Sequence, residues 1–432
     1  MISFMYPWAF LLLIPAIMLT LLMMFRKRPA IRIPSVIPLK KSGNSAKLRL
    51  TLMETAIVLA MTAMPAKADN TQVSLLTCSP GDEVYALFGH TALRYSNPDK
   101  KIDIVFNYGI FSFEEPNFVW RFILGETDYM VTSTPYSHFI YEYYLRGSGV
   151  TEQILALDSL QKENIYKTLT DNCKRENRTY RYNYFYNNCT TKIRDKVEEQ
   201  ASKATYNGEP QATTIRKAVE QHTAVQPWTS FGINLLLGAG VDKAATRETL
   251  QFLPVYLQND YTTATINGNP LVIAEKQLLT PQEKESVPNN LTPFNCALLV
   301  LLFTMIIMLC EVRSRKIFWW YDTIMLLIQG VAGTLLLFMV FFSQHPCVDS
   351  NYLLIWLNPA ALVLIPITIC RAVKHKSMKF MLAQTAMVAI FLLTAPFVPQ
   401  EYPTPIFIFA TAYLVRSIFH IYRIKICDLS LY

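Results

Sequence analysis

Long apolar runs separate a polar middle segment from two hydrophobic ends of the chain. A helix needs about 20 mostly apolar residues to cross a hydrocarbon core of about 30 Å. No such run occurs between residues 69 and 290. Apolar runs lie at about 3–25, 294–311, 321–343, 352–370, 380–399 and 405–422, with a shorter one at 50–66. The pattern predicts a polar domain over 69–290, followed over 291–432 by an all-α transmembrane bundle of five helices.

The loops between the apolar runs alternate in charge. Lys and Arg are absent from the loops at 344–351 and 398–404, but they gather in the loops at 26–49, 313–316 and 371–379. Cytoplasmic loops carry an excess of Lys and Arg. The charge pattern therefore places 69–290 on the outer side of the membrane. It also accounts for the net charge of +8 without a nucleic-acid partner.

The first 68 residues leave three alternatives open. A basic segment precedes the apolar run 50–66, which ends in Ala66-Lys67-Ala68, a sequence similar to a signal-peptide cleavage site. The stretch from Met5 to Ser35 resembles the membrane hairpin that opens aerotolerance-type von Willebrand A proteins, although no such domain follows. Residues 1–68 contain one or two apolar helices and are expected to be a two-helix membrane hairpin, a fused remnant, or a cleaved export signal with a mature start at Asp69.

Within the polar segment, a strand-like pattern of apolar residues is followed by a helical one. Over residues 73–129, β-forming residues alternate with turn residues, which predicts strands and hairpins. Later stretches have apolar residues three and four positions apart, as in helices that pack one face on a core. These stretches are 160–173, 189–204, 215–221 and 244–253. The segment 69–290 is therefore predicted to be an α+β domain.

A histidine and a cysteine in this domain suit covalent acyl chemistry. His90 follows Gly89 on a strand-like run, and Cys189 follows Asn188, a natural N-cap for the helix that comes next. Unpaired N–H groups and the helix dipole in the first turn favour the thiolate form of a cysteine. A nearby histidine can act as the general base. The alternatives are a structural histidine and a buried or disulfide-bonded cysteine.

Asp103 is the predicted third member of this site. It follows His90 by about a dozen residues and could accept the second imidazole N–H, which would fix the tautomer. A solvated turn carboxylate is the alternative. A disulfide between Cys78 and Cys173 also stays open, because spacing does not determine pairing. The sequence has no HExxH, CxxC, Walker or GxGxxG motif, so neither a metal nor a cofactor is expected.

The surroundings of the pair resemble the Lnb-type bacterial lipoprotein N-acyltransferases. The resemblance rests on Phe88-Gly89-His90-Thr91-Ala92-Leu93-Arg94, Asn107-Tyr108-Gly109 and Asn188-Cys189-Thr190-Thr191, and it extends from about residue 73 to 422. The order of histidine before cysteine is similar to the permuted NlpC-type branch of the papain-like fold, which includes lecithin:retinol acyltransferase. The resemblance implies a permuted papain-like periplasmic domain on a bundle in the bacterial inner membrane.

The resemblance also implies a reaction. A fatty acyl chain would pass from a membrane phospholipid to the N-terminal cysteine of a diacylated lipoprotein, through a thioester on Cys189. His90 would move the protons, and N–H groups at the helix start, together with the Asn188 side chain, would stabilise the oxyanion. Arg94 and Tyr108 lie in the matching motifs as supporting residues.

Three polar residues of the membrane part belong to the same resemblance. His345, Asn351 and Asn358 lie in a His-Pro to Asn-Pro stretch that recurs in the family. An asparagine inside an apolar helix is costly without a partner. The three residues are therefore expected to bind or orient the lipid substrate. The alternative is an interface loop with capping asparagines.

Two other functions remain open at this point. One is a papain-like cysteine peptidase or amidase that cuts cell-wall peptides, and the other is a non-catalytic membrane assembly scaffold. A wall peptidase needs reach and usually a single anchor, whereas five helices suit a substrate that lies in the bilayer. A scaffold leaves the pair of His90 and Cys189 unexplained.

Overall fold

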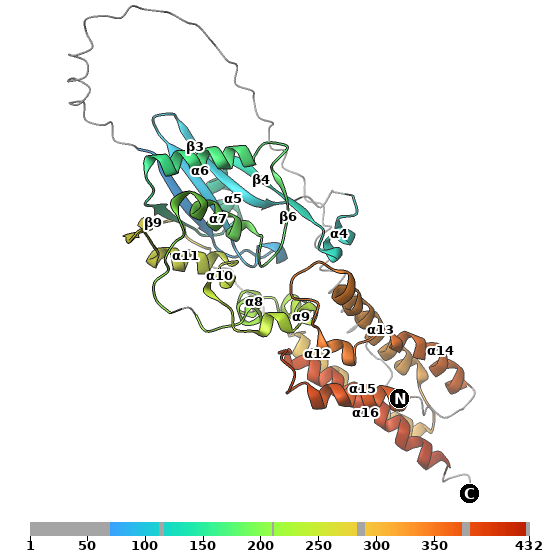
Figure 1. The fold of residues 1–432 in the computed structure, drawn as a ribbon. Helices are drawn as coiled ribbons and strands as arrows, with labels where there is room; N and C mark the ends of the chain where they lie inside the picture. Colours follow the sequence, from blue (N-terminus) through green and yellow to red (C-terminus); the bar gives the residue numbers. More distant parts are fainter. Residues whose placement is uncertain (1–69, 112–115, 210, 283–289, 374–380, 429–432) are drawn as a thin grey trace, which may run out of the picture.

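A computed structural model describes residues 70–111, 116–209, 211–282, 290–373 and 381–428. The three alternatives for residues 1–68 lie outside these described residues. An α+β domain comes first and is followed by a helical region that extends away from it (Figure 1). The predicted order of an α+β domain and then apolar helices is therefore confirmed.

The α+β domain is built on one seven-stranded sheet, in which all neighbouring strands are antiparallel. The strand order is β6 (Thr179–Arg181), β4 (Asp128–Pro135), β3 (Ile102–Ile110), β2 (His90–Asn97), β1 (Gln72–Cys78), β5 (Val150–Leu155) and β9 (Val272–Leu279). A separate hairpin joins β7 (Thr265–Ile266) to β8 (Asn269–Pro270). Six of the seven residues of β1 are buried, as expected for a strand covered on both faces.

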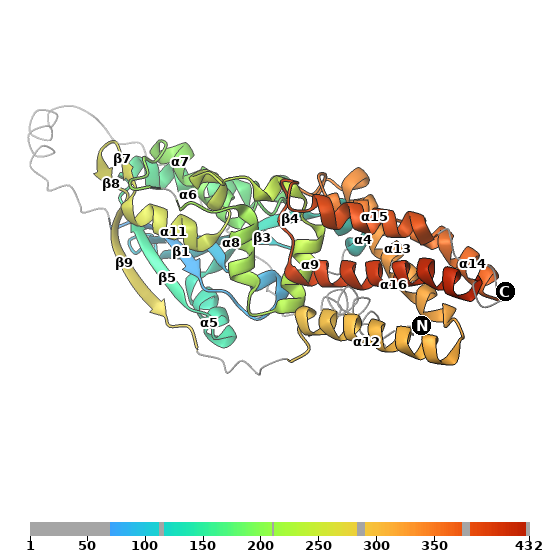
Figure 2. The same cartoon turned by 90° about the horizontal axis from the view of Figure 1, so that it is seen from below.

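Helices cover both faces of the sheet (Figure 2). Along β2, Leu93 faces one hydrophobic core and Ala92 faces another, because successive side chains point to opposite faces. The Leu93 core is closed by α6 (Ser159–Asn172), α7 (Cys189–Ala201) and α11 (Pro254–Thr263), and the Ala92 core by α5 (Tyr136–Arg146). The start of α7 thereby lies against the sheet beside β2 and β3.

A group of short helices connects the sheet to the helical region. It contains α8 (Ile215–Thr223), α9 (Pro227–Leu236), η2 (Ala239–Asp242) and α10 (Arg247–Leu250). Arg216 holds this connector together, because its buried guanidinium pairs with Asp242 at 2.6 Å and also donates to the carbonyls of Leu237 and Gly238. Bidentate Arg–carboxylate pairs fix geometry as well as charge. The connector is therefore a rigid link.

The helical region contains α12 (Pro293–Ser314), α13 (Trp319–Phe342), α14 (Ala360–Val373), α15 (Met381–Thr394) and α16 (Thr404–Asp428). Three described segments are long and apolar enough to cross a membrane: Pro293–Ser314, Trp319–Phe342 and Tyr352–Arg371. The other two apolar helices, Met381–Thr394 and Thr404–His420, are shorter. The predicted run 352–370 is not one helix, since η3 (Tyr352–Ile355) precedes Asn358-Pro359 and α14 begins after it.

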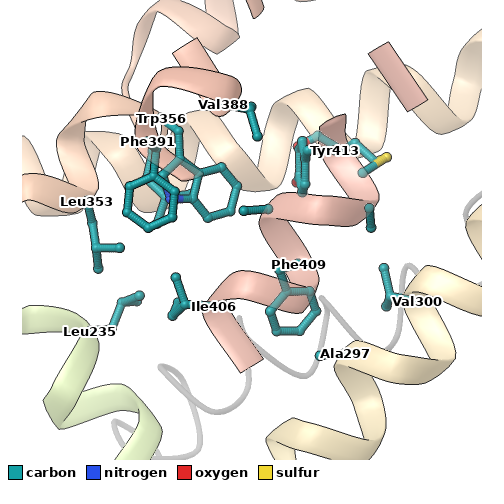
Figure 3. Packing of buried hydrophobic residues seen from close by; sticks show 14 of the residues in the cluster. Leu235, Ala297, Val300, Leu353, Trp356, Val388, Phe391, Ile406, Phe409 and Tyr413 are labelled. Atoms are coloured by element: carbon teal, nitrogen blue, oxygen red, sulfur yellow. The ribbon is translucent and has the colours of Figure 1, made fainter. Parts of the chain in front are cut away.

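Aromatic and aliphatic side chains from several helices meet in the core of this region (Figure 3). Trp356 and Phe391 lie with ring centroids 5.7 Å apart, and Tyr413 packs against Trp356 at 5.4 Å. Leu235, from the connector helix α9, belongs to the same cluster. The connector and the membrane helices therefore share one hydrophobic core.

Hydrogen bonds between backbones fix the sheet domain on the near ends of the helices. The loop after α13 binds the end of α4 (Phe118–Leu124), where Gln344 N donates to Leu124 O at 2.8 Å. Gly125 has φ +74°, and a Cβ there would lie 2.7 Å from the backbone nitrogen of His345. The same loop receives a bond from Gly238 N to Cys347 O at 2.8 Å. This docking leaves no room for a side chain at Gly125.

Candidate active site

Cys189 is the first residue of α7, as the sequence predicts. Asn188 is the N-cap, and its Oδ1 accepts from the backbone nitrogens of Thr190 (2.9 Å) and Thr191 (3.0 Å). The Asn188 Nδ2 donates to the carbonyl oxygens of Tyr184 (2.9 Å) and Phe252 (2.7 Å). Only 9% of Cys189 is exposed. Both ends of the Asn188 amide are therefore engaged, and in this structure no free amide N–H remains for the oxyanion role expected from the sequence.

His90 begins β2 directly after Gly89, a position at which no residue with a side chain fits. Gly89 has φ +76°, and a Cβ there would lie 2.6 Å from Cys78 O. The imidazole hydrogen-bonds the Cys189 thiol, and the Thr91 backbone N–H also binds the sulfur. Thr91 Oγ1 lies 3.1 Å from Thr190 Oγ1, which joins the strand to the helix. The predicted pair of His90 and Cys189 therefore comes together.

Asn107, not Asp103, binds the other side of the His90 ring. His90 Nε2 lies 3.3 Å from Asn107 Oδ1, which leaves Nδ1 for the thiol. The sheet register explains the error, since Asn107 lies opposite Ala92 whereas Asp103 lies opposite Ser96. The two positions on β3 are about 13 Å apart at 3.3 Å per residue. A Cys-His-Asn set also occurs in papain-like proteases.

Asp103 belongs to an ion-pair cluster with Arg94. Arg94 binds both carboxylate oxygens of Asp103 at 2.7 and 2.8 Å and Glu152 at 2.9 Å. Its guanidinium also stacks 3.5 Å from the centroid of the Tyr136 ring. Tyr108, the other supporting residue expected from the motifs, is buried, and its hydroxyl accepts from Asn172 Nδ2 at 2.7 Å. The contacts of Arg94 and Tyr108 are those of structural residues.

The geometry favours a thiolate beside an imidazolium. Burial raises the pKa of Cys189, but the positive charge of His90 and hydrogen bonds from His90, Thr91 and Thr190 outweigh it and lower the pKa to about 7. Burial lowers the pKa of His90, but the charge of Cys189 and hydrogen bonds with Cys189 and Asn107 raise it above the ordinary value. A thiolate is the reactive form of a cysteine.

Alkylation of Cys189 by iodoacetamide is expected to follow a titration near pH 7. The thiolate fraction, and with it the rate, falls as the pH drops below that value. Cys173 is the internal control, because burial raises its pKa to about 11 despite a hydrogen bond with Ser133. His90→Ala should move the Cys189 titration to higher pH, because it removes the charge that favours the thiolate. Mass spectrometry of both cysteines across pH measures this, and identical profiles for the two would contradict it.

The membrane-side residues expected to bind lipid have internal partners. His345 Nε2 lies 2.5 Å from Phe122 O, and burial lowers the pKa of this histidine. Asn351 donates to Leu235 O at 2.8 Å and caps η3 by accepting from Leu353 N at 3.1 Å. Asn358 donates to Trp356 O at 3.3 Å, and its backbone packs against Gly333. These contacts fix the loop between α13 and α14, and Asn351 has the capping role that the alternative expects.

Two features of the site escape sequence reasoning. The first is Asn107, although the Asn107-Tyr108-Gly109 motif marks its position. The second is a group of tyrosines. The ring centroids of Tyr182 and Tyr129, which stack, are 4.0 Å apart, and those of Tyr184 and His345 are 5.6 Å apart. The disulfide left open by the sequence does not form, because Cys78 and Cys173 are both free.

Family comparisons agree with this division of the chain. A model of the Lnb N-terminal periplasmic domain matches residues 63–221, and a model of the Lnb transmembrane domain matches residues 282–426. The first match contains His90, Asn107 and Cys189, and the two matches together cover more than two thirds of the chain. No curated protein and no solved structure matches the chain. The chain therefore belongs to the Lnb family, as a membrane protein with the periplasmic and transmembrane domains of that family.

Proposed function

We propose that this protein transfers a fatty acyl chain from a membrane phospholipid to the α-amine of a diacylated lipoprotein's N-terminal cysteine. The Lnb family points to a lipoprotein N-acyltransferase-like role. One observation carries the proposal for this chain. It is the hydrogen-bonded pair of Cys189 and His90, with Asn107 behind the imidazole, in a domain fixed on the ends of membrane helices.

In the first half-reaction the Cys189 thiolate attacks the carbonyl carbon of a glycerol ester. A C–S bond forms, and the carbonyl electron pair moves to oxygen. When the pair returns, the C–O bond to glycerol breaks and the leaving alkoxide takes a proton from the His90 imidazolium. The products are an acyl-thioester on Cys189 and a lysophospholipid.

In the second half-reaction the lipoprotein amine attacks the thioester carbon. His90, now neutral, takes a proton from the amine nitrogen as the C–N bond forms. The C–S bond then breaks, and the thiolate leaves beside the imidazolium formed in this step. Cys189 and His90 are then again a thiolate and an imidazolium, as at the start, and the N-acylated lipoprotein departs. These steps involve only the Cys189 thiol, the His90 imidazole and the two substrates.

Apolar side chains near the site support a lipid substrate. Tyr85 and Trp120 are each 55% exposed and Tyr186 is 54% exposed. Tyr85 shortly precedes His90 in the chain, and Tyr186 shortly precedes Cys189. Trp120 packs on Phe338 of α13 at 5.2 Å, and the Tyr186 hydroxyl lies 3.8 Å from Cys347 Sγ. Exposed aromatic residues are typical of the membrane–water interface. This surface suits an ester in the outer leaflet better than a wall peptide.

The proposal includes an architecture for the whole chain. Residues 69–290 form the periplasmic catalytic domain as a permuted papain-like unit, and the five helices of 291–432 cross the bacterial inner membrane. Residues 1–68 form the hairpin or export signal. His345 and Asn351 act by holding the bundle against the catalytic domain, through Phe122 O and Leu235 O, and Asn358 acts within the bundle, where it contacts Trp356 and Gly333. Severing the chain between the two domains is therefore expected to abolish transfer.

Reconstitution of the full chain tests the proposal. Phospholipid vesicles with the protein and a synthetic diacylated lipopeptide should yield the lipopeptide with one added acyl chain and an equal amount of lysophospholipid, both measured by mass. A lipopeptide with an acetylated α-amine is the control and should not react. No acylated product, or release of wall peptides without added lipid, would contradict the proposal, and the second result would favour the peptidase.

A further inference from the structure

The start of α7 can supply only part of an oxyanion hole. Attack on an ester or thioester places negative charge on the acyl oxygen, which preorganised hydrogen-bond donors stabilise. The backbone nitrogens of Thr190 and Thr191 are committed to Asn188 Oδ1, and the Asn188 amide is committed to two carbonyls. Among the described groups, the Cys189 N–H is the donor left at this helix start. A second donor must come from the opposite wall.

Gly109 brings that wall close to the thiol. Its φ is +88°, and a Cβ built there would lie 3.5 Å from Cys189 Cβ and 3.7 Å from Tyr182 Cε2. The side chains of Cys189 and Tyr182 therefore both lie within van der Waals distance of the same point. Since Gly109 has no side chain, no Cβ occupies that point.

The Tyr182 ring is held in place while its hydroxyl is free. The ring stacks on Tyr129 at 4.0 Å and meets the edge of Tyr184 at 5.4 Å. No described residue hydrogen-bonds the Tyr182 hydroxyl, whereas Tyr129 and Tyr184 bond each other. Burial, together with the negative charge of Cys189 and neighbouring tyrosines, raises the pKa of Tyr182 well above its ordinary value. The hydroxyl therefore keeps its proton and can donate it in a hydrogen bond.

We propose that Tyr182 is a catalytic residue whose hydroxyl, with the Cys189 N–H, donates to the acyl oxygen. The inference rests on the acyl transfer proposed above. In each half-reaction the carbonyl electron pair moves to this oxygen as the nucleophile bonds to carbon. The oxyanion accepts both hydrogen bonds, and the pair returns when the leaving group departs. Tyr182 keeps its proton throughout, so the proton balance still involves only His90.

Tyr182→Phe tests this role, since it removes the hydroxyl and keeps the ring. Loss of one oxyanion donor is expected to lower kcat by about 10²-fold to 10³-fold with little change in KM. The rate at which iodoacetamide alkylates Cys189 should not change, because that reaction builds no oxyanion. Tyr182→His, whose ring N–H can donate, should recover part of the lost kcat. Tyr95→Phe is the matched control, since no described residue hydrogen-bonds that buried hydroxyl, and it should keep full activity.

Each other outcome has a definite meaning. If Tyr182→Phe keeps kcat within about twofold of the unaltered protein while Cys189→Ser is inactive, the inference on Tyr182 is wrong and the proposed function stands. If alkylation slows as much as acyl transfer does, Tyr182 positions the thiol and is not a donor. If Cys189→Ser transfers acyl chains normally, the proposed function and the inference both fail.

Discussion

Replacing Cys189 by serine is expected to lower acyl transfer by at least about 10⁴-fold, the order of loss when a catalytic nucleophile is removed. The Cys189 thiol has a pKa of about 7, so a large share of it is thiolate at neutral pH. A serine hydroxyl stays protonated there and would need His90 to remove its proton during attack. Product mass and lysophospholipid release in vesicles measure the loss.

A trapping experiment accompanies this substitution. Without lipopeptide, the unaltered protein should accumulate one acyl chain on Cys189, which neutral hydroxylamine releases as expected for a thioester. Cys173→Ser is the matched control, because it makes the same exchange at a free thiol at the end of α6. That variant should trap and transfer as the unaltered protein does. An acyl chain trapped at another residue, or normal transfer by Cys189→Ser, would show that Cys189 is not the nucleophile.

The parts of the site that local sequence determines could be predicted. Asn188 and Thr191 lie within one helical turn of Cys189, so their capping pattern is visible in the sequence. The setting of His90 is also local, since Gly89 must accept a close backbone contact next to it. The partner of the imidazole is different. Whether Asn107 or Asp103 reaches His90 depends on the pairing of β2 with β3, which the sequence of either strand does not specify.

The same division holds for the fold. Apolar length and loop charge predict the membrane region and its orientation, because both follow from properties of single segments. They do not predict that Asn358-Pro359 separates η3 from α14, or that Asn351 turns inward to bind Leu235 O. The second detail depends on the connector helix α9, because the carbonyl of Leu235 accepts the hydrogen bond. The sequence likewise does not show that Phe252 O, distant along the chain, accepts one of the amide hydrogens of Asn188.

Four buried ionisable side chains join three of the membrane helices, α12, α13 and α16. Arg416 of α16 binds Asp322 of α13 at 2.6 Å and Glu311 of α12 at 3.1 Å, and His420 Nε2 lies 2.9 Å from the same Asp322. All four side chains are almost fully buried. Removing one partner of a buried ion pair costs about 3–5 kcal/mol, because the other charge loses its compensation. Arg416 is the shared cation of two carboxylates, so its loss should be the most damaging in this cluster.

Arg416→Met is therefore expected to destabilise the protein by at least about 3 kcal/mol and to lower its melting temperature and its level in the membrane. Arg416→Lys should recover only part of the stability, because an ammonium group cannot match the fork of a guanidinium. Combining Arg416→Met with Glu311→Gln and Asp322→Asn should recover much of it, since no buried carboxylate then remains uncompensated. The control is Arg313→Met, at an exposed position near the end of α12. Thermal unfolding in lipid nanodiscs compares the variants. If Arg416→Met melts at the temperature of Arg313→Met, the cluster does not hold the helices together.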